Sequence, residues 1–381
     1  MANEQHDWLT DEYPELRAGP PWVMAEMIDA QPSLVEPILG AKGEELGALR
    51  SEVMEAARSG GPVVVTGCGT SEHAALVVAE LLTESFRSSG LAARAVARQA
   101  LDAALDPQPG GVCIAISHNG KTRPTQLALQ AARMQGARTA LITAYEDPAC
   151  LAAADHHFLT PRHDDSWCHT LAYTSAILAG ATIAGQSGDE VAQRALSAIT
   201  STLDCRADFE AAAAHLDCRR IVTAGMGIDL VSASELALKI AEGARLPTAT
   251  YHLETILHGY LAGCDAAATG LVLFGLDPRL GERHGSLLTL VAEAASAIGM
   301  PIVLVAGGGL SASLSDTVLT VALDSLAARA GLLPPLLQSA VALQLLTLGL
   351  VGLTGTNPDL IRREEAAYRE AAQIGKATPG W

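Results

Sequence analysis

Short apolar runs alternate along the chain with longer stretches whose apolar residues recur at helical spacing. In the first half the short runs predict strands, and the stretches that follow them predict amphipathic helices. Strands are expected at 62–66, 112–116 and 139–143, helices at 73–85 and 125–135, and a further helix and strand within 149–159. Because strands and helices alternate, this half is expected to form a parallel sheet with right-handed crossovers.

The second half of the chain repeats this plan. Strands are expected at 220–224, 270–274 and 302–305, and helices at 230–241 and 286–298. A Gly-x-Gly turn follows the first strand of each half, at Gly67/Gly69 and Gly225/Gly227, which suggests duplication. We therefore expect an α/β fold of two domains, over residues 46–200 and 205–355.

The remaining segments are helical or polar. The lead-in, 1–45, includes a predicted helix over 22–39, and Ala-rich helical sequence over 174–213 lies between the two halves. A last helix is expected over 336–353, before a charged tail, 356–381. The apolar stretch 332–353 contains prolines and glutamines, so it is predicted to be a buried helix rather than a membrane span.

Charge and cysteine content narrow the class of protein. The chain has 381 residues, a formal net charge of −17 and a pI near 5.0, which argues against nucleic acid and membranes as partners. Seven cysteines are scattered without CxxC spacing, as is typical of reduced thiols in a cytoplasmic protein. The acidic N-terminal segment lacks the apolar core of a signal peptide, so no export is expected.

Two polar loops of the first half carry groups suited to binding an anion. Residues 67–71 form a glycine-rich turn from strand to helix, and residues 117–122 link strand 112–116 to the helix after Pro124. Backbone N–H groups at a helix N-terminus, beside hydroxyls and a lysine, form an anion cradle. The first loop alone is equally consistent with an ordinary turn. Together the loops lie where open α/β sheets bind ligands, which predicts a small anionic ligand.

These loops, with their partial repeat in the second half, resemble the tandem sugar isomerase (SIS) domain family over roughly residues 45–370. The family's first turn reads Cys-Gly-Thr-Ser, as do residues 68–71, and its anion loop commonly reads Ser-Gln-Ser-Gly-Glu-Thr, matched at Ser117, Gly120 and Thr122. The family includes the isomerase part of glucosamine-6-phosphate synthase, sugar-phosphate deaminases and fructosamine-phosphate deglycases. The resemblance implies two flavodoxin-type domains, each a doubly wound parallel sheet in αβα layers.

The resemblance also implies which residues bind the ligand. The contacts would come from Gly69, Thr70, Ser71, Ser117, His118, Asn119, Lys121 and Thr122. The sugar hydroxyls would meet Thr70 and Ser71, and the anionic group would meet the second loop. Lys121 replaces a carboxylate of the family's loop and should strengthen anion affinity, whereas His118 and Asn119 could reshape the pocket for a different group.

A third segment of the family's site, Ser-Thr-Lys, aligns with residues 166–171. Thr170 matches and is expected to contact the sugar, Leu171 stands in place of the lysine, and His169 is new. Trp167 could stack on a sugar face or be a partly buried structural residue.

The candidate proton-transfer base is Glu242. Glu235, Lys239 and Glu242 fall at i, i+4 and i+7, on one face of the predicted helix 230–241. Glu235 and Lys239 are expected to form a solvent-exposed ion pair. The string 237–242, Ala-Leu-Lys-Ile-Ala-Glu, resembles the family's Ala-Leu-Lys-Leu-Lys-Glu, whose glutamate moves a proton between C1 and C2.

The second candidate catalytic group is His258. A histidine suits ring opening because it can shuttle a proton between the ring oxygen and the anomeric hydroxyl near neutral pH. The family carries His-Gly here, and its histidine often serves the site of a neighbouring subunit; in this chain Tyr260 replaces the proline that usually follows. The alternative is a histidine that caps a surface turn.

Two further patterns bear on cofactors and on amination. One group of side chains raises the question of a metal, but its spacing fits a polar loop better than a ligand set: His156, His157, His163, Asp164, Asp165 and His169.

Family members that transfer an amino group carry a lysine after an Asn-Pro-Asp-like segment. Here that position falls on Ala366, the nearest lysine is Lys376, and no glutaminase domain precedes the first half, so glutamine-driven amination is not expected.

Two classes of function follow. The first is a cytoplasmic enzyme, a homodimer or higher homo-oligomer, that isomerises a hexose or hexosamine 6-phosphate, or removes its amine as a deaminase or deglycase. No cofactor or metal is expected, because an enediol route needs only acid–base groups. The second is a sugar-phosphate-binding regulatory module without turnover.

Overall fold

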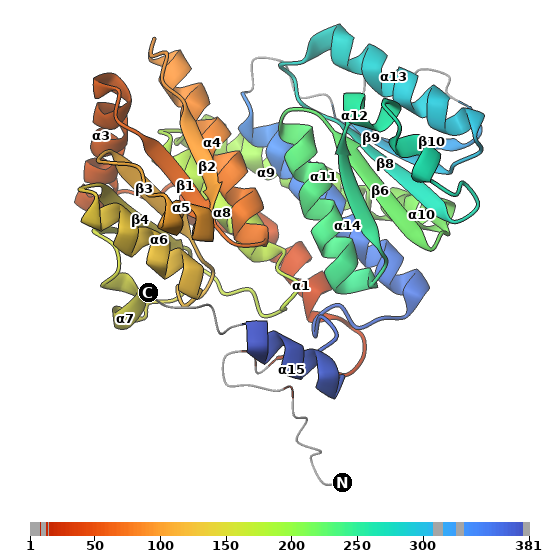
Figure 1. The fold of residues 1–381 in the computed structure, drawn as a ribbon, viewed down its shortest axis with the longest axis horizontal. Coiled ribbons are helices and arrows are strands. Elements are labelled where there is room, and N and C mark those ends of the chain that lie inside the picture. Colours follow the sequence, from red (N-terminus) through yellow and green to blue (C-terminus); the bar gives the residue numbers. More distant parts are fainter. Residues whose placement is uncertain (1–7, 9–12, 14, 308–314, 325–330, 376–381) are drawn as a thin grey trace, which may run out of the picture.

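The computed structural model describes Trp8, Tyr13 and residues 15–307, 315–324 and 331–375. The first half forms a five-stranded sheet in the order β2-β1-β3-β4-β5, in which every neighbouring pair is parallel (Figure 1). Its strands are β1 (Val63–Gly67), β2 (Ala95–Gln99), β3 (Val112–Ile116), β4 (Arg138–Thr143) and β5 (His156–Leu159). This strand order is that of doubly wound, flavodoxin-type sheets.

The second half forms an equivalent five-stranded parallel sheet, in the order β10-β9-β8-β6-β7. Its strands are β6 (Arg220–Gly225), β7 (Thr248–His252), β8 (Thr269–Gly275), β9 (Ile302–Gly307) and β10 (Val318–Leu323). The two sheets have the same order when each is numbered from its own first strand. The predicted fold class and the duplication of the α/β unit are therefore confirmed.

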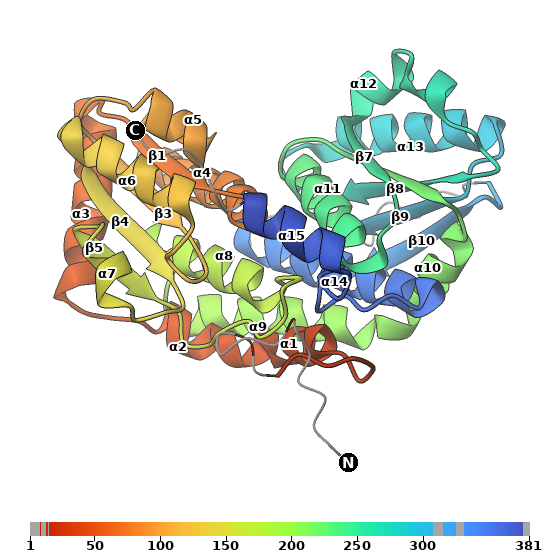
Figure 2. The ribbon, with the colours of Figure 1, turned by 60° about the horizontal axis from the view of Figure 1, so that its bottom comes forward.

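Helices cover both faces of the sheets and fill the space between them (Figures 1 and 2). The N-terminal and first-domain helices are α1 (Val23–Ala30), η1 (Gln31–Leu34), α2 (Val35–Leu39), α3 (Glu44–Ser59), α4 (Thr70–Ser88), α5 (Ala100–Leu105), α6 (Arg123–Met134) and α7 (Pro148–Leu151). The next are α8 (Leu171–Ile183), α9 (Asp189–Asp204) and α10 (Arg206–Leu216). The second half adds α11 (Ile228–Lys239), the π-helical turn η2 (Ile240–Ala244), α12 (Leu253–Leu257), η3 (Tyr260–Gly263), α13 (Gly281–Ala297), α14 (Leu333–Thr354) and α15 (Ala366–Gly375).

One large hydrophobic core joins the inner faces of the two sheets. Val65 and Ile114 of the first sheet and Val272 and Phe274 of the second belong to it, together with side chains of α4, α8, α11 and α14. Strand residues of opposite parity face away from this core; Cys113, for example, packs in a separate cluster with Ala132 of α6. Both faces of each central strand are therefore buried, which explains their uninterrupted apolar sequence.

The same tight turn opens the first long helix of each domain. Gly69 and Gly227 precede α4 and α11 with φ/ψ of 58°/−126° and 61°/−131°, a backbone conformation that only glycine adopts without strain. A Cβ on Gly67 would lie 2.5 Å from the carbonyl oxygen of Ser71, and the equivalent atom on Gly225 would meet Asp229 at 2.4 Å. The Gly-x-Gly signal therefore reflects a steric need in both halves.

The structure adds three strands that the apolar pattern does not predict: β2, β7 and β10. β7 and β10 lie at opposite edges of the second sheet, and β2 lies at one edge of the first. Few of their residues are buried, because an edge strand has only one neighbour and its faces are less covered. Such strands need no continuous apolar run, so the period-2 signal is weak.

Two predicted helices differ in detail from those observed. The helix expected over 22–39 is divided by the 3₁₀ segment η1, with Pro32 near its start. Its proline cannot donate a backbone hydrogen bond within the helix. The helix expected over 230–241 begins at Ile228 and passes at Ile240 into the π-helical turn η2. This turn carries Glu242, the candidate proton-transfer base.

The prediction of a buried apolar helix near the C-terminus is confirmed by α14. Among the described residues it is the one helix long and apolar enough to cross a membrane, and 78 % of its most apolar window is buried within the protein. It packs against α8, α9, α10 and α11 in the centre of the molecule.

Candidate functional site

The two candidate ligand loops lie side by side at the carboxyl ends of the strands of the first sheet. Strands β1 and β3 are paired in parallel, so the turn before α4 and the loop 117–122 leave the sheet at adjacent carboxyl ends. Thr70 and Ser71 from the turn line a cavity together with His118 and with His169 and Tyr173 from the region of α8. This cavity measures about 20 Å³, room for about one water molecule.

The hydroxyls of loop 117–122 are paired with each other beside that cavity. Oγ of Ser117 donates to Oγ1 of Thr122 at 3.2 Å, and Oδ1 of Asn119 accepts from the backbone N–H of Lys121 at 3.0 Å. Nζ of Lys121 lies 3.5 Å from Asp147, and its side chain is 54 % exposed. The structure therefore brings Ser117 and Thr122 together but directs the lysine toward the surface.

Rings line the cavity at His118, His169 and Tyr173, and further rings pack against His118. The His118 ring lies 4.7 Å from that of His169 and 5.4 Å from that of Tyr145, and Tyr145 stacks on His163 at 3.9 Å. Burial lowers the pKa of His118 to about 3, helped by the neighbouring His169. Burial and the positive charges of Lys239 and Arg363 lower the pKa of His169 to about 3 as well. Both rings are neutral near pH 7 and offer hydrogen bonds rather than charge.

Asp164 holds the segment that supplies His169 and Thr170. Its fully buried carboxylate accepts backbone N–H bonds from Ser166, Thr170 and Ala172. Burial raises the pKa of Asp164, and these hydrogen bonds oppose the rise. Oγ1 of Thr170 is buried and has no hydrogen-bond partner among the described residues. Within that part of the chain, no three His, Cys, Asp or Glu side chains converge as a metal site would require.

The neutral state of the buried histidines predicts how the stability of the protein depends on pH. The folded pKa of His118 is about 3, below its usual 6.5, so the stability tied to its neutral form is complete above pH 6.5 and falls as the pH drops toward 3. The expected loss is up to about 1.4 kcal/mol per pH unit below 6.5. Urea unfolding at pH 7.5 and pH 5.0 should show a steeper decline for the natural protein than for His118→Gln. Equal declines would contradict this origin of the effect.

Glu235 and Lys239 are buried between the domains, so the prediction of a solvent-exposed pair is wrong. Both side chains are 0 % exposed, and Nζ of Lys239 lies 3.6 Å from Oε1 of Glu235. Helix α11 packs on its own sheet and also against α4 and α14, which leaves this face no contact with water (Figures 1 and 2). Nδ1 of His73, on α4, lies 2.6 Å from Oε2 of Glu235 and completes a hydrogen bond across the domain boundary.

Lys239 also holds Glu242 at the end of this buried group. Its Nζ donates to Oε2 of Glu242 at 2.5 Å, and the Glu242 side chain is 24 % exposed. Burial lowers the pKa of Lys239, but the carboxylates of Glu242 and Glu235 more than offset this, so its pKa is raised and the ammonium stays charged. The arrangement presents an oriented, partly accessible carboxylate, which is what a proton-transfer base requires.

The C-terminal segment brings an arginine to the same place. The guanidinium of Arg363 lies 4.1 Å above the ring of Trp167, and burial lowers the Arg363 pKa while Tyr13 and Glu242 oppose the shift. Trp167 also meets Tyr13 edge to face at 5.6 Å. Its ring thus packs against the terminal segments of the chain. Ala366 begins the exposed helix α15, and Lys376 lies outside the described residues.

His258 is not brought to this group within one chain. Its side chain is 71 % exposed, and its Nε2 lies 2.8 Å from Oε1 of Glu254, four residues earlier. It follows α12, which lies beside edge strand β7 of the second domain (Figure 2). Sequence alone did not indicate the positions of His73 and Arg363 in the site, because His73 meets Glu235 across 162 residues and Arg363 meets the distant Trp167.

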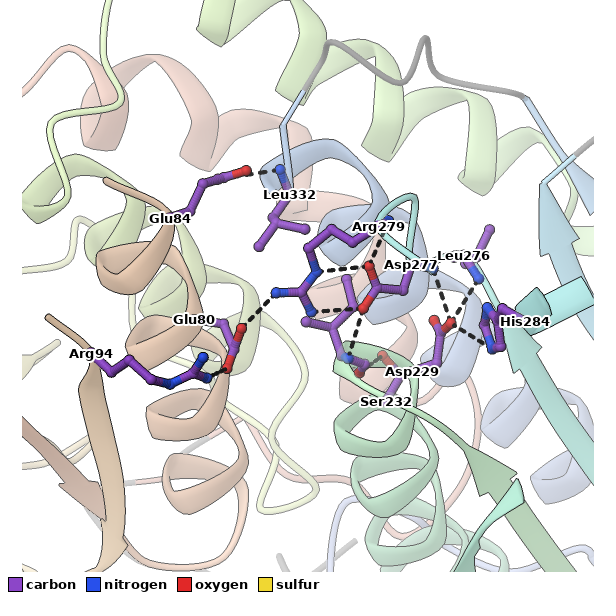
Figure 3. Close-up of polar contacts among 11 residues, drawn as sticks. Glu80, Glu84, Arg94, Asp229, Ser232, Leu276, Asp277, Arg279, His284 and Leu332 are labelled. Carbon is purple, nitrogen blue, oxygen red and sulfur yellow. Dashed lines mark hydrogen bonds and ion pairs between the residues drawn. The ribbon is translucent and has the colours of Figure 1, made fainter. Parts of the chain in front are cut away.

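The second domain places its own carboxylate where the first has the candidate anion loop (Figure 3). Oδ2 of Asp277 accepts from the backbone N–H of Ile228 at 3.2 Å, and a Cβ on Gly227 would lie 2.5 Å from that oxygen. Arg279 neutralises Asp277 at 2.7 Å and also bonds Glu80 of α4 at 2.6 Å. The N-terminus of α11 is therefore already occupied by an anionic group of the chain itself.

A cavity of about 910 Å³ opens beside this carboxylate in the second domain. Its described lining includes no lysine or arginine but carries four carboxylates: Asp277, Glu282, Glu293 and Asp324. A negative lining repels an anionic sugar. The candidate site for such a ligand is therefore the first-domain cavity beside loops 67–71 and 117–122, together with its boundary with α11.

Comparison with known proteins identifies the type of domain. Residues 58–187 match the family model described as SIS domain. No curated protein matches the chain in sequence. The chain is a protein of two SIS-like α/β domains, and its predicted resemblance to that family is confirmed.

Several solved structures share the whole fold. The C-terminal domain of glucosamine-fructose-6-phosphate aminotransferase from Francisella tularensis is similar with a TM-score of 0.75 and 19% identity, over 90% of this chain and 98% of that one. Tagatose-6-phosphate ketose/aldose isomerase from Escherichia coli gives 0.72 and 19%, over 90% and 95%. Glucosamine-6-phosphate deaminase from Thermotoga maritima gives 0.66 and 17%, over 88% and 96%.

Proposed function

We propose that this protein is an enzyme that moves a proton between C1 and C2 of an anionic sugar, most simply a hexose or hexosamine 6-phosphate. The observation that carries the proposal is the Lys239–Glu242 pair, a charged and oriented carboxylate beside the segment that holds His169. A binding module has no need for a buried ammonium that fixes one partly exposed carboxylate. The structurally similar isomerase and deaminase support the same chemistry.

In the proposed reaction, the open-chain sugar presents C1 and C2 to Glu242. The carboxylate takes the proton from C2 of an aldose while O1 gains a proton, which gives an enediol. The same group returns the proton to C1 while O2 loses its proton, which gives the ketose. With an amine on C2, the same transfer produces an imine at C2, and addition of water releases ammonia. The neutral His118 and His169 and the hydroxyls of Thr70 and Ser71 would bind sugar oxygens.

A sugar phosphate can bind only if the first-domain cavity widens. Its present volume of about 20 Å³ is far below the roughly 300 Å³ or more of typical ligand pockets. We propose that His118 and His169 move apart as the ligand enters and that Ser117 and Thr122 exchange their mutual hydrogen bond for bonds to the anionic group. The anion would also meet the N-terminus of α6, which begins at Arg123.

The proposal is tested with a panel of aldose and ketose phosphates, hexosamine phosphates, fructosamine phosphates and sulfonated sugars. Conversion of one class by the purified protein, followed by product analysis, separates isomerisation from loss of an amine. If panel members bind without turnover, the sugar-phosphate-binding regulatory module is the better description, and if none binds, both proposals fail.

A subunit-mixing prediction concerns His258. Because this side chain is exposed and lies apart from Glu242 within one chain, we expect it to complete the site of a second subunit. His258→Asn and Glu242→Gln should each be inactive alone. Unfolded together and refolded as mixed dimers, they should recover about a quarter of the natural activity, since half the dimers would contain one intact site.

The control for this experiment mixes each variant with itself through the same refolding step. Absence of recovery in the mixed sample, with dimers demonstrated by light scattering, would place His258 outside the partner's site.

A further inference from the structure

Within the described part of the chain, His73 forms the one hydrogen bond to the buried carboxylate of Glu235. Its Nδ1 lies 2.6 Å from Oε2, whereas Oε1 is buried without a hydrogen-bond partner in the described part of the chain. His73 stands on the first turn of α4, two residues after Ser71. The contact therefore connects the candidate sugar-binding turn of one domain to the catalytic helix of the other.

Two carboxylates compete for the single ammonium of Lys239. Its Nζ is 2.5 Å from Glu242 but 3.6 Å from Glu235, so it hydrogen-bonds the first and only approaches the second. In a buried setting an unpaired carboxylate is costly, and Glu235 is fully buried. The histidine satisfies Glu235 and thereby leaves Lys239 available to Glu242.

We propose that His73 is a positioning residue: by holding Glu235, it keeps Lys239 on Glu242 and so orients the proton-transfer carboxylate. Without His73, Glu235 draws the ammonium toward itself, and Glu242 loses the partner that fixes it. Because His73 follows the Thr70–Ser71 turn, a ligand that moves this turn also acts on the orientation of Glu242. This inference rests on the proposed function of Glu242.

The charged and titratable groups around His73 come from several elements. On its own helix Glu72 is adjacent, and Glu235 of α11 faces it. Around Glu235 and Lys239 lie Glu242 of η2 and, near the start of α8, Cys168, His169 and Tyr173, and Arg363 acts on His169 and Glu242. Loss of the histidine removes the hydrogen bond to Glu235 within this coupled group, so it is expected to alter the pH profile of turnover.

The test compares His73→Leu, which removes the donor, with His73→Asn, whose amide nitrogen takes the place of Nδ1. For the panel sugar that is turned over fastest, His73→Leu should lower kcat about ten- to a hundredfold, as expected for one lost hydrogen bond to a charged group. Its KM should stay within about threefold, because the sugar contacts remain. The kcat–pH profile should shift at its acid limb, and His73→Asn should recover most of kcat.

A double variant distinguishes positioning from a general structural effect. In His73→Leu/Glu235→Gln the competing charge is gone, so Lys239 should return to Glu242 and kcat should rise above that of His73→Leu alone. A natural kcat in His73→Leu, or a double variant no faster than the single one, would overturn the inference. If the natural protein turns over none of the panel sugars, the proposed function itself fails, and if Glu242→Gln retains full turnover, the role of Glu242 fails, whatever His73 does.

Discussion

Replacing Glu242 with glutamine should abolish turnover while sugar-phosphate binding survives. The amide keeps the size and approximate shape of the side chain but cannot accept the C2 proton, so kcat should fall by about 10³-fold or more, within the range for loss of a general base. The side chain is 24 % exposed, so the exchange removes little packing. Initial rates and a binding isotherm with the same sugar measure both effects.

The control for Glu242→Gln is Glu210→Gln, an exchange of an exposed glutamate on α10 of the same domain. It tests whether removal of one negative charge from the protein is enough to lower turnover. Natural turnover in Glu242→Gln would show that another group is the proton-transfer base, and equal loss of binding would mean that the carboxylate holds the ligand rather than acting on it.

Replacing Lys239 with methionine should destabilise the protein severely. The ammonium is the cation between Glu235 and Glu242, and its removal leaves the fully buried Glu235 without a positive charge at 3.6 Å. Breaking a buried ion pair from one side costs about 3–5 kcal/mol, because the remaining charge stays desolvated. Urea unfolding at pH 7.5, followed by circular dichroism, should show a lower transition midpoint with an unchanged slope.

An exposed pair provides the comparison for Lys239→Met. Arg58 and Glu55 lie 3.8 Å apart on α3, and their side chains are 57 % and 71 % exposed. Arg58→Met should change the free energy of unfolding by less than about 1 kcal/mol. Equal effects of the two substitutions would show that the Lys239 site is not closed to water as the structure has it.

The central strands were predictable because both of their faces are buried. Strands β1, β3 and β8 lie between neighbours and beneath helices on both sides, so their sequences are continuous apolar runs. Edge strands β2, β7 and β10 consist mostly of partly buried or exposed positions and have no such run. The three edge strands were not predictable because their faces are less covered than those of a central strand, not because they are shorter.

Part of the candidate site also follows from the sequence. Loops 67–71 and 117–122 follow the strands β1 and β3. Because these strands pair in parallel, the two loops are necessarily neighbours. The environment of Glu235 and Lys239 does not follow in this way. Charges four residues apart are usual on solvent-exposed helices, and only the packing of α4 and α14 against α11 decides that these are buried.

The sequence by itself determined the duplicated α/β plan, the two glycine turns and the position of loop 117–122 between a strand and a helix, because these depend on short-range periodicity and local sterics. The tertiary structure decided which charges act together. It placed His73 against Glu235 across 162 residues, filled the α11 turn with Asp277, and closed the first-domain cavity with His118 and His169. These outcomes depend on burial and on contacts between distant segments, which no local pattern encodes.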